Sequence, residues 1–257
     1  MSSSAELTTA ASFDGVTAVQ LATRLALPRV DLFDDVSSTL DVAHRVAPDA
    51  PTGTLVLADR QSAGRGRHGR RWASAPGAGI WLTLIERPAD TRALDVLSLR
   101  CGLQAAGVLD SLAGERIALK WPNDLYLRGR KLAGILIETR WRGTAPDWVA
   151  IGFGLNIVAP ELDTAIGLPN GSSRLDALTR LVPALRRAAA AEGLLTRTEL
   201  ADWRMRDLTL GRAVNTPAIG VAAGIDAAGE LLIEGPDGIV SRHRTGSLTL
   251  DGPLPCS

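Results

Sequence analysis

Four apolar segments between residues 117 and 156 constrain the fold most, because only short links separate them. They cover residues 117–121, 125–127, 132–140 and 148–153, and the first two links read Pro-Asn-Asp and Arg-Gly-Arg-Lys. Links of this length join strands that are antiparallel neighbours in a sheet. The sequence therefore predicts an antiparallel sheet in the middle of the chain.

Helical patterns flank these strands, so we expect an α/β fold. Apolar side chains recur every three or four residues over 92–112, which predicts a helix. A second helix is expected over 176–191, where Pro183 either kinks the helix or marks its true start. Short apolar runs at 54–58 and 80–86 predict two further strands.

The two ends of the chain differ from this middle region. Residues 1–30 are rich in Ser, Thr and Ala, which favours a mobile tail or one short helix over 16–27. After Gly211, short strands alternate with Gly-rich turns, as is typical of a small β-barrel. We therefore expect three parts: an N-terminal segment (1–30), an α/β domain (31–208) and a small β domain (209–257).

Composition and charge exclude several classes of function. The chain of 257 residues has 28 basic and 28 acidic side chains, and this neutral sum argues against a polycation that binds nucleic acid or membranes. Two cysteines, Cys101 and Cys256, are too few for a disulfide framework or a thiolate zinc site, and they favour a reduced, cytosolic protein. No run approaches the roughly 20 apolar residues that span a bilayer, and the N-terminus lacks the pattern of a secretory signal.

Only two of the 28 basic residues are lysines, and both fall in one short segment. Because arginine serves almost everywhere else, Lys120 and Lys131 indicate places that need a compact ammonium, for example at a phosphate or carboxylate oxygen. Chance is the alternative explanation, and their proximity in the sequence makes it less attractive.

A basic, glycine-rich loop lies between the strands at 54–58 and 80–86. Residues 60–72 contain five arginines and three glycines, and such glycines let a backbone wrap a ligand while arginines bind phosphate or carboxylate. The run GRGRHG also matches a dinucleotide-binding turn, but no helix fits the Pro- and Gly-rich residues after it. Three interpretations of this loop stay open: a flap that closes over a small anion, an arm that binds nucleic acid, and a solvated basic loop. The net charge of zero counts against the nucleic-acid arm.

A second candidate site is the run Lys-Trp-Pro-Asn-Asp at 120–124, which predicts a tight turn between strands. The turn presents Lys120, Asn123 and Asp124 at one edge, and Lys131 starts the next strand. Two ammonium groups, an amide and a carboxylate could bind a nucleotide phosphate and its metal. A hairpin with solvated ends is the alternative.

Two weaker signals are each explained by local structure when taken alone. Ser38 and Thr39 are residue types that cap a helix N-terminus. The strand that ends at 152–156 (Gly-Phe-Gly-Leu-Asn) finishes in Asn156, two residues after Gly154, and a bulge or turn is sufficient to explain it.

In their order along the chain, these motifs resemble those of biotin protein ligases. The resemblance runs from about residue 31 to the end and rests on SST at 37–39, QSAGRGRHGRRW at 61–72, KWPNDLYL at 120–127, RKLAGILIE at 130–138 and GFGLN at 152–156. It implies a catalytic domain related to class II aminoacyl-tRNA synthetases, with a mixed, largely antiparallel sheet, and a C-terminal SH3-like barrel. It also implies that biotin and ATP give biotinyl-5′-AMP and pyrophosphate, and that biotin then passes to a lysine on the biotin carboxyl carrier domain of an acetyl-CoA or acyl-CoA carboxylase.

The resemblance also implies a role for individual residues. The residues it places at biotin are Ser38, Thr39, Leu40, Gln61, Arg65, Gly66, Arg67 and Lys131. Those it places at ATP or the adenylate are Gly64, Arg65, Gly66, Arg67, Gly69, Arg70, Trp72, Lys120, Asn123, Lys131 and Asn156. The catalytic residues it implies are Arg67, Lys120, Asp124 and Lys131. Mg²⁺ is expected to arrive with ATP near Asn123 and Asp124, with no ligand firmly assigned. The sequence departs from the family pattern at Leu40, where Asn is common, and at His68, where Arg is frequent.

These residue types suit the implied chemistry. The biotin carboxylate itself attacks the α-phosphorus, so catalysis consists mainly of holding two anions together and neutralising developing charge. Arg67, Lys120, Lys131 and Mg²⁺ would supply that charge, and an ordering loop would keep water from the acyl phosphate. Asp124 is the candidate to orient or deprotonate the acceptor lysine.

Other functions stay open. A lipoate or octanoyl ligase or transferase shares the catalytic fold, and an anion- or RNA-binding module that uses the arginine loop is the non-enzyme alternative. A DNA-binding winged helix needs about 60 residues, whereas about 30 precede the catalytic pattern, so we expect no DNA binding. We also expect no membrane partner, a cytoplasmic location, and a monomer or weak homodimer.

Overall fold

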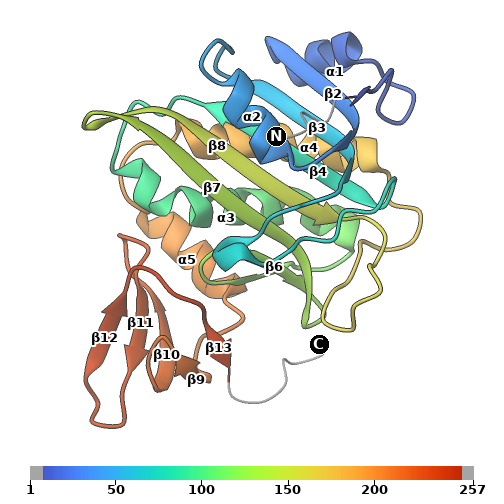
Figure 1. Ribbon diagram of the computed structural model, residues 1–257. Helices are drawn as coiled ribbons and strands as arrows, with labels where there is room; N and C mark the ends of the chain where they lie inside the picture. The colour runs from blue at the N-terminus through green and yellow to red at the C-terminus, as the bar shows by residue number, and fades with distance from the viewer. Residues whose placement is uncertain (1–7, 251–257) are drawn as a thin grey trace, which may run out of the picture.

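The computed structural model of the chain describes residues 8–250, which form one large and one small β-sheet with helices packed on the large one (Figure 1). The helices are α1 (Ala18–Leu25), α2 (Thr39–Val46), α3 (Ala93–Ala113), α4 (Arg174–Ala190) and α5 (Arg197–Arg206). None of these helices is long and apolar enough to cross a membrane.

The large sheet has eight strands. In their order across the sheet they are β1 (Thr8–Thr9), β2 (Arg29–Val36), β3 (Thr54–Gln61), β4 (Gly79–Glu86), β8 (Ala145–Asn156), β7 (Arg130–Arg142), β6 (Asp124–Leu127) and β5 (Ala118–Lys120). Only β2 and β3 pair in parallel, so the sheet is mixed and largely antiparallel as predicted. The turn between β6 and β7 consists of Arg128 and Gly129, both with positive φ, which is the geometry of a two-residue hairpin.

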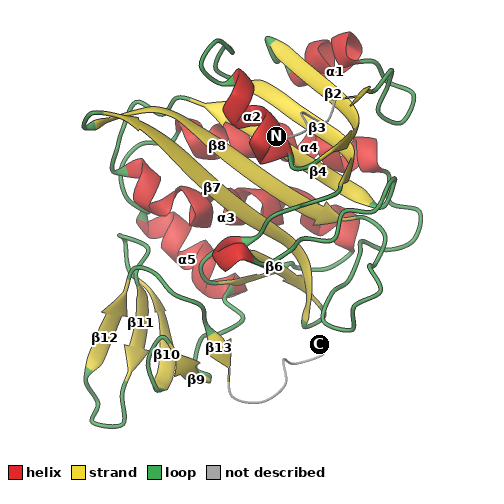
Figure 2. Cartoon of the chain, in the orientation of Figure 1, coloured by secondary structure: helices red, strands yellow, loops and turns green. Residues whose placement is uncertain are grey.

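Helices cover both faces of this sheet (Figure 2). On one face, α3 and α4 pack in the main hydrophobic core, while α2 packs on the other face with Phe33, Val36 and Trp148 in a second cluster. All eight residues of β4 are buried, because a central strand with helices on both sides has no solvated face. The predicted α/β fold is therefore confirmed.

The N-terminal segment is not a mobile tail over the residues that the structure describes. Its short helix is confirmed as α1, which begins with a capping box between Thr17 and Gln20. Phe13 and Leu21 are buried in the main core, and β1 pairs with β2. The predicted border after residue 30 falls inside β2, which begins at Arg29.

Two other expectations need correction. Pro183 lies inside α4 and does not mark the start of the helix. The helix begins at Arg174, with Ser173 as its N-cap. The helix α5 was not predicted, because its one buried residue is Trp203 and no apolar periodicity marks it. Cys101 is buried in α3 as expected of a core cysteine, whereas Cys256 lies outside the described residues.

The small β domain expected after Gly211 is a five-stranded antiparallel sheet. Its strands in spatial order are β12 (Val240–His243), β11 (Leu231–Glu234), β10 (Gly220–Ile225), β9 (Ala213–Thr216) and β13 (Thr249–Leu250). Figure 1 shows this sheet on the side of the molecule where β6 lies, away from β2 and β3. The domain borders at residues 30 and 208 stay predictions.

Candidate active site

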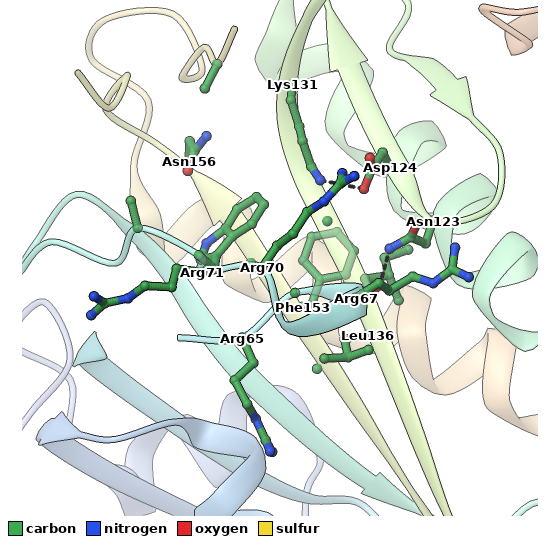
Figure 3. A pocket seen from close by; sticks show the side chains of 18 of the residues that line it. Arg65, Arg67, Arg70, Arg71, Asn123, Asp124, Lys131, Leu136, Phe153 and Asn156 are labelled. Carbon is green, nitrogen blue, oxygen red and sulfur yellow. Dashed lines mark hydrogen bonds and ion pairs between the residues drawn. The ribbon is translucent and has the colours of Figure 1, made fainter. Parts of the chain in front are cut away.

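A cavity of about 360 Å³ lies over β7 and β8 and collects most of the residues singled out from the sequence (Figure 3). Of the predicted site residues, 14 line it: Ser38, Thr39, Leu40, Gln61, Arg65, Gly66, Arg67, Arg70, Trp72, Lys120, Asn123, Asp124, Lys131 and Asn156. Gly64 and Gly69 are the two that do not. Segments far apart in the sequence thus converge on one hollow.

One end of the cavity is a neutral hydrogen-bonding network. The Thr83 hydroxyl donates to Thr39 Oγ1 at 2.9 Å, and the Thr39 backbone N–H and hydroxyl donate to Gln61 Oε1 at 2.9 and 3.2 Å. Gln61 Nε2 donates to Ser74 Oγ at 2.9 Å. These contacts fix the orientation of the Gln61 amide, with Oε1 toward Thr39 and Nε2 toward Ser74. The network therefore forms a polar wall whose donors and acceptors have fixed positions.

Ser38 and Leu40 combine a structural role with a place in the cavity wall. Ser38 is the N-cap of α2, and its Oγ accepts from the Leu40 N–H at 3.3 Å, so the predicted cap is confirmed. Leu40 is buried, and a Cβ added at Gly152 would lie 3.1 Å from Leu40 Cδ1. Leu40 therefore makes this part of the wall apolar.

The arginine loop folds as a small hairpin. The Gly66 N–H donates to Arg70 O at 2.8 Å, and the Trp72 N–H donates to Gly64 O at 2.9 Å. Gly69 sits at the tip with φ +70°, and a Cβ at Gly64 would lie 2.7 Å from Trp72 O. These two glycines therefore shape the backbone, and their predicted contact with ATP stays a prediction.

The arginines of this hairpin face different ways (Figure 3). Arg67 extends toward Asn123, and Arg70 extends toward Asp124. The Arg65 guanidinium instead lies 2.9 Å from Asp41 Oδ1 and 3.6 Å from Glu138 Oε2. It anchors the hairpin to α2 and β7, and the predicted contacts of Arg65 with biotin and ATP stay predictions.

Arg71 has a similar anchoring role, because its Nη2 donates to the Ser62 backbone oxygen at 3.0 Å. Arg67 is the partly buried member of the set: burial lowers the pKa of its guanidinium, with the charge of Asp124 acting in the opposite sense. A partly desolvated, permanently charged guanidinium at a cavity is well suited to bind an anion.

The other end of the cavity is strongly cationic. Lys131 Nζ lies 2.7 Å from Asp124 Oδ1 and 5.2 Å from the centre of the Trp72 ring. Burial lowers the pKa of Lys120, and the charges of Lys131 and Arg70 lower it further, while Asp124 opposes them. Both lysines of the chain therefore face one cavity, together with Arg67 and Arg70. Asp124 is the one carboxylate among the described residues that line it.

Trp72 rests on two glycines that face each other across β7 and β8. Gly134 and Gly154 are register partners, and a Cβ at Gly154 would lie 2.6 Å from Trp72 Nε1. A Cβ at Gly134 would lie 3.1 Å from Trp72 Cζ3. Glycine at both positions lets the indole lie flat on the sheet beside Lys131.

The two asparagines hold backbone around the cavity. Asn123 Nδ2 donates to Ile135 O at 2.7 Å, and the Ile135 N–H donates to Asn123 O at 3.0 Å, which ties the 120–124 turn to β7. Asn156 Nδ2 donates to Ile166 O at 3.2 Å, and the Ile166 N–H donates to Lys131 O at 3.0 Å. Asn156 thus fixes the loop that runs beside Lys131.

Sequence reasoning missed several lining residues. Six belong to no motif: Pro160, Leu162, Thr164 and Ala165 in the loop after β8, and Ser247 and Leu248 from the small domain. Two others, Leu136 and Phe153, lie within the motifs at 130–138 and 152–156 but were given no role. The alternation of β7 was the available signal for Leu136, whereas nothing in the sequence pointed to Ser247 or Leu248.

The register of β7 and β8 orders the cavity from neutral to charged. Leu136 pairs with Gly152 beside Leu40, and two positions away Gly134 pairs with Gly154 beneath Trp72. Two residues along a strand span about 7 Å. The neutral wall and the cationic cluster are therefore close enough for one small molecule with an apolar body and an anionic end.

No group of three or more metal-ligating side chains suitable for a metal ion occurs between residues 8 and 250. Mg²⁺ in nucleotide sites is typically held by one or two carboxylates and the substrate phosphates. The lone carboxylate of Asp124 fits that arrangement and does not form an all-protein metal site.

Comparison with known proteins agrees with the fold and the motifs. The sequence model of the Biotin/lipoate A/B protein ligase family matches residues 32–156. The chain is 35% identical over 227 residues to the biotin–[acetyl-CoA-carboxylase] ligase of Mycobacterium tuberculosis, with 77% of this chain and 80% of that one covered. It is 34% identical over 215 residues to the bifunctional ligase/repressor BirA of Escherichia coli, with 77% of this chain and 67% of that protein covered.

A solved structure shares the fold. The biotin protein ligase from Aquifex aeolicus, in complex with biotin and ATP, covers 88% of this chain and 99% of its own, with a TM-score of 0.71 and 23% identity. The chain therefore belongs to the biotin/lipoate A/B protein ligase family. Within that family it belongs with the biotin protein ligases.

Proposed function

We propose that the chain is an ATP-dependent biotin protein ligase that forms biotinyl-5′-AMP and transfers biotin to a carrier-protein lysine. The observation that carries the proposal is the cavity itself, in which a neutral amide and hydroxyl wall adjoins the only two lysines of the chain. Biotin has a neutral ureido group, an apolar ring and chain, and a terminal carboxylate, so its chemistry follows the same order as the cavity.

At the neutral end, Ser38, Thr39 and Gln61 bind the ureido group by hydrogen bonds, and Leu40 packs against the apolar ring. The Gln61 amide is already held by Thr39 and Ser74, so it need not reorganise when the ligand arrives. A polar wall of this kind rejects an acid without a ureido group, because its donors and acceptors would lose water without gaining a partner. This feature favours biotin over lipoate or octanoate, the alternative substrates within the fold.

At the cationic end, Arg67, Lys120 and Lys131 bring the biotin carboxylate and the α-phosphate of ATP together. A carboxylate oxygen attacks the α-phosphorus, the bond to the bridging oxygen breaks, and pyrophosphate leaves with the electron pair. Positive charge held in place stabilises the transition state without reorganisation during the reaction. Asn123 and Asp124 are the residues that would hold Mg²⁺, which would supply positive charge to the phosphates.

Trp72 and the arginine hairpin to which it belongs cover the adenylate. The indole lies over Gly134 and Gly154 and presents a flat surface to the adenine, while Arg70 and Asn123 lie at the phosphate side. An acyl phosphate survives only where water is excluded, and a hairpin anchored through Arg65 can supply that cover.

In the second step, the acceptor lysine attacks the acyl carbon, and AMP leaves. The attacking amine must first lose a proton, and Asp124 is the one carboxylate lining the described cavity. We assign Asp124 to orient or deprotonate that amine. The acceptor is the carrier domain of an acetyl-CoA or acyl-CoA carboxylase. The name of the relative in Mycobacterium tuberculosis gives acetyl-CoA carboxylase as the protein that the relative modifies.

The proposal includes a cytoplasmic location, no DNA partner and a monomer or weak homodimer. A gel-shift assay with biotinyl-AMP present tests the DNA partner, and sedimentation with and without biotinyl-AMP tests the oligomeric state.

The experiment that tests the activity is ATP–pyrophosphate exchange with biotin, lipoate and octanoate in parallel. Exchange that depends on biotin and is weak with the other two acids supports the proposal. Exchange with lipoate or octanoate alone would assign the chain to the alternative reaction, and no exchange with any acid would favour a binding module.

A further inference from the structure

A charged cluster outside the cavity holds the arginine hairpin (residues 64–72) from one side. The Arg65 guanidinium lies 2.9 Å from Asp41 Oδ1 and 3.6 Å from Glu138 Oε2, and Figure 3 shows Arg65 pointing away from Arg67 and Arg70. Neither Asp41 nor Glu138 lines the cavity. These two carboxylates therefore act on a bound molecule through Arg65 and not by direct contact.

Neighbouring side chains hold both carboxylates in place. Asp41 stands in the first turn of α2, and its Oδ2 accepts from the Ser37 hydroxyl at 3.1 Å. Glu138 Oε2 contacts His44 Nε2, and the His44 ring packs against the buried Trp148, with ring centres 4.9 Å apart. Carboxylates that are held in this way lose little side-chain freedom when they pair with a guanidinium.

The register of β7 places Glu138 directly beyond the neutral end of the cavity. Gly134, Leu136 and Glu138 are alternate residues of β7 and lie on one face of the sheet. Gly134 supports Trp72, and Leu136 lines the cavity, so Glu138 is about 7 Å beyond Leu136 on the side away from the cationic cluster. The hairpin is therefore held at two places, through Trp72 at the cationic end and through Arg65 beyond the neutral end.

The ion pairs of Arg65 are open to solvent, so they are weak and depend on salt. The side chains of Arg65 and Asp41 are each 41% exposed, and that of Glu138 is 32% exposed. Exposed pairs of this kind change an equilibrium constant by up to about fivefold each, and salt screens them. Such contacts stabilise a closed hairpin and still let it open between turnovers.

We propose that Asp41 and Glu138 are positioning residues: through Arg65 they keep the arginine hairpin closed over biotinyl-AMP. His44 holds Glu138 in place for this contact. This inference rests on the proposed function and separates two tasks within it. The lysines assigned to adenylate formation lie at the other end of the cavity, so loss of either carboxylate shortens the retention of the adenylate and leaves its rate of formation unchanged.

The first experiment measures release of labelled adenylate by rapid filtration in Asp41→Asn and Glu138→Gln. Each substitution removes a charge and keeps the shape of the side chain. We expect release about two- to fivefold faster in either variant, while adenylate formation in a single turnover stays within about twofold of the wild-type rate.

Asp147→Asn is the matched control for these variants. Asp147 pairs with Arg142 at 2.9 Å, the same distance as between Arg65 and Asp41, and the pair lies near the turn that joins β7 and β8. Asp147→Asn therefore removes an equivalent charge from the same two strands and releases the adenylate at the wild-type rate.

A double-mutant cycle shows whether the carboxylates act through Arg65. Arg65→Ala by itself releases the adenylate faster, and Asp41→Asn adds no further acceleration in that background, because the contact is already lost. If Asp41→Asn accelerated release as much in the Arg65→Ala background as in the wild type, the carboxylate would act by another route and the inference would fall.

Trypsin digestion gives a readout that needs no ligand. The hairpin contains four arginines, at positions 65, 67, 70 and 71, after which trypsin cleaves. We expect cleavage within residues 64–72 to be about two- to fivefold faster in Asp41→Asn than in Asp147→Asn. The difference narrows as salt is raised, because salt screens the ion pairs that the control retains.

The outcomes distinguish this inference from the proposed function. Release and cleavage equal to those of Asp147→Asn would overturn the positioning role while biotin-dependent exchange persists, and so would adenylate formation that slows as much as retention falls. Absence of biotin-dependent exchange in the wild type would instead refute the proposed function, and trypsin cleavage would still show whether the two carboxylates hold the hairpin.

Discussion

Replacing Gly154 with alanine tests the assigned role of Trp72 with little risk to the fold. Gly154 has no positive φ, so alanine suits its strand backbone. The added methyl group would lie 2.6 Å from Trp72 Nε1, 2.7 Å from Cε2 and 3.0 Å from Cζ2. Ordinary contacts between such atoms are about 3.5–4.0 Å, so the indole must move away from the sheet by about 1 Å. The indole sits on a surface hairpin that can shift more easily than the sheet.

The cost of that movement follows from the contact area. A buried tryptophan covers 150–250 Å², and Trp72 is half-buried, so about 100 Å² of contact is at stake. At about 25 cal/mol per Å² this is about 2.5 kcal/mol, or about 60-fold in an equilibrium constant. We therefore expect Gly154→Ala to release biotinyl-AMP about 60-fold faster, while KM for biotin in the first step stays close to that of the wild type.

The assay is retention of labelled adenylate after rapid filtration, with two graded controls. Gly134→Ala places its methyl 3.1 Å from Trp72 Cζ3, so a smaller loss of a few-fold is expected. Gly107→Ala meets no atom within 4 Å on the exposed side of α3 and leaves retention unchanged. Equal retention in Gly154→Ala and the wild type, or equal losses in all three variants, would refute the role given to Trp72.

Three further predictions concern the charged end. Arg67→Gly should let the adenylate leak more than tenfold faster, and unchanged retention on filtration would exclude that role. Asp124→Asn should slow biotin transfer to the carrier domain about tenfold or more but adenylate formation much less; equal slowing of the two steps, measured by single-turnover kinetics, contradicts the assignment. Because burial lowers the pKa of Lys120, its positive charge is lost at a lower pH than that of an ordinary lysine. The value of kcat/KM for ATP should therefore fall as pH rises through that lowered pKa, and Lys120→Arg should move the fall to higher pH; an unmoved profile would mean that another group titrates.

The fold was predictable where local pattern and connection length decide it. Short links left β5, β6 and β7 no arrangement other than antiparallel neighbours, and the regular apolar spacing of α3 placed it within one residue at each end. By contrast, α5 was missed because Trp203 is its one buried residue, so no periodic apolar face exists to detect. A two-residue strand such as β1 likewise carries no pattern of its own.

The site was predictable as a set of residues but not as a geometry. Glycine and arginine in the loop indicated an anion site, and Arg67 and Arg70 do face the cavity. The sequence could not show that Arg65 turns to Asp41 and Glu138, because that pairing depends on α2 and β7 being brought beside the hairpin. For the same reason Ser247 and Leu248 were invisible, since only the docking of the small sheet brings them to the cavity.

Native mass spectrometry of the chain incubated with biotin, ATP and Mg²⁺ tests the central claim most directly. We predict a complex with the mass of bound biotinyl-AMP, which disappears when an apo carrier domain is added as that domain gains one biotin on a single lysine. A chain that binds ATP and biotin but never carries the adenylate, or an adenylate that persists unchanged in the presence of the carrier domain, would contradict the account.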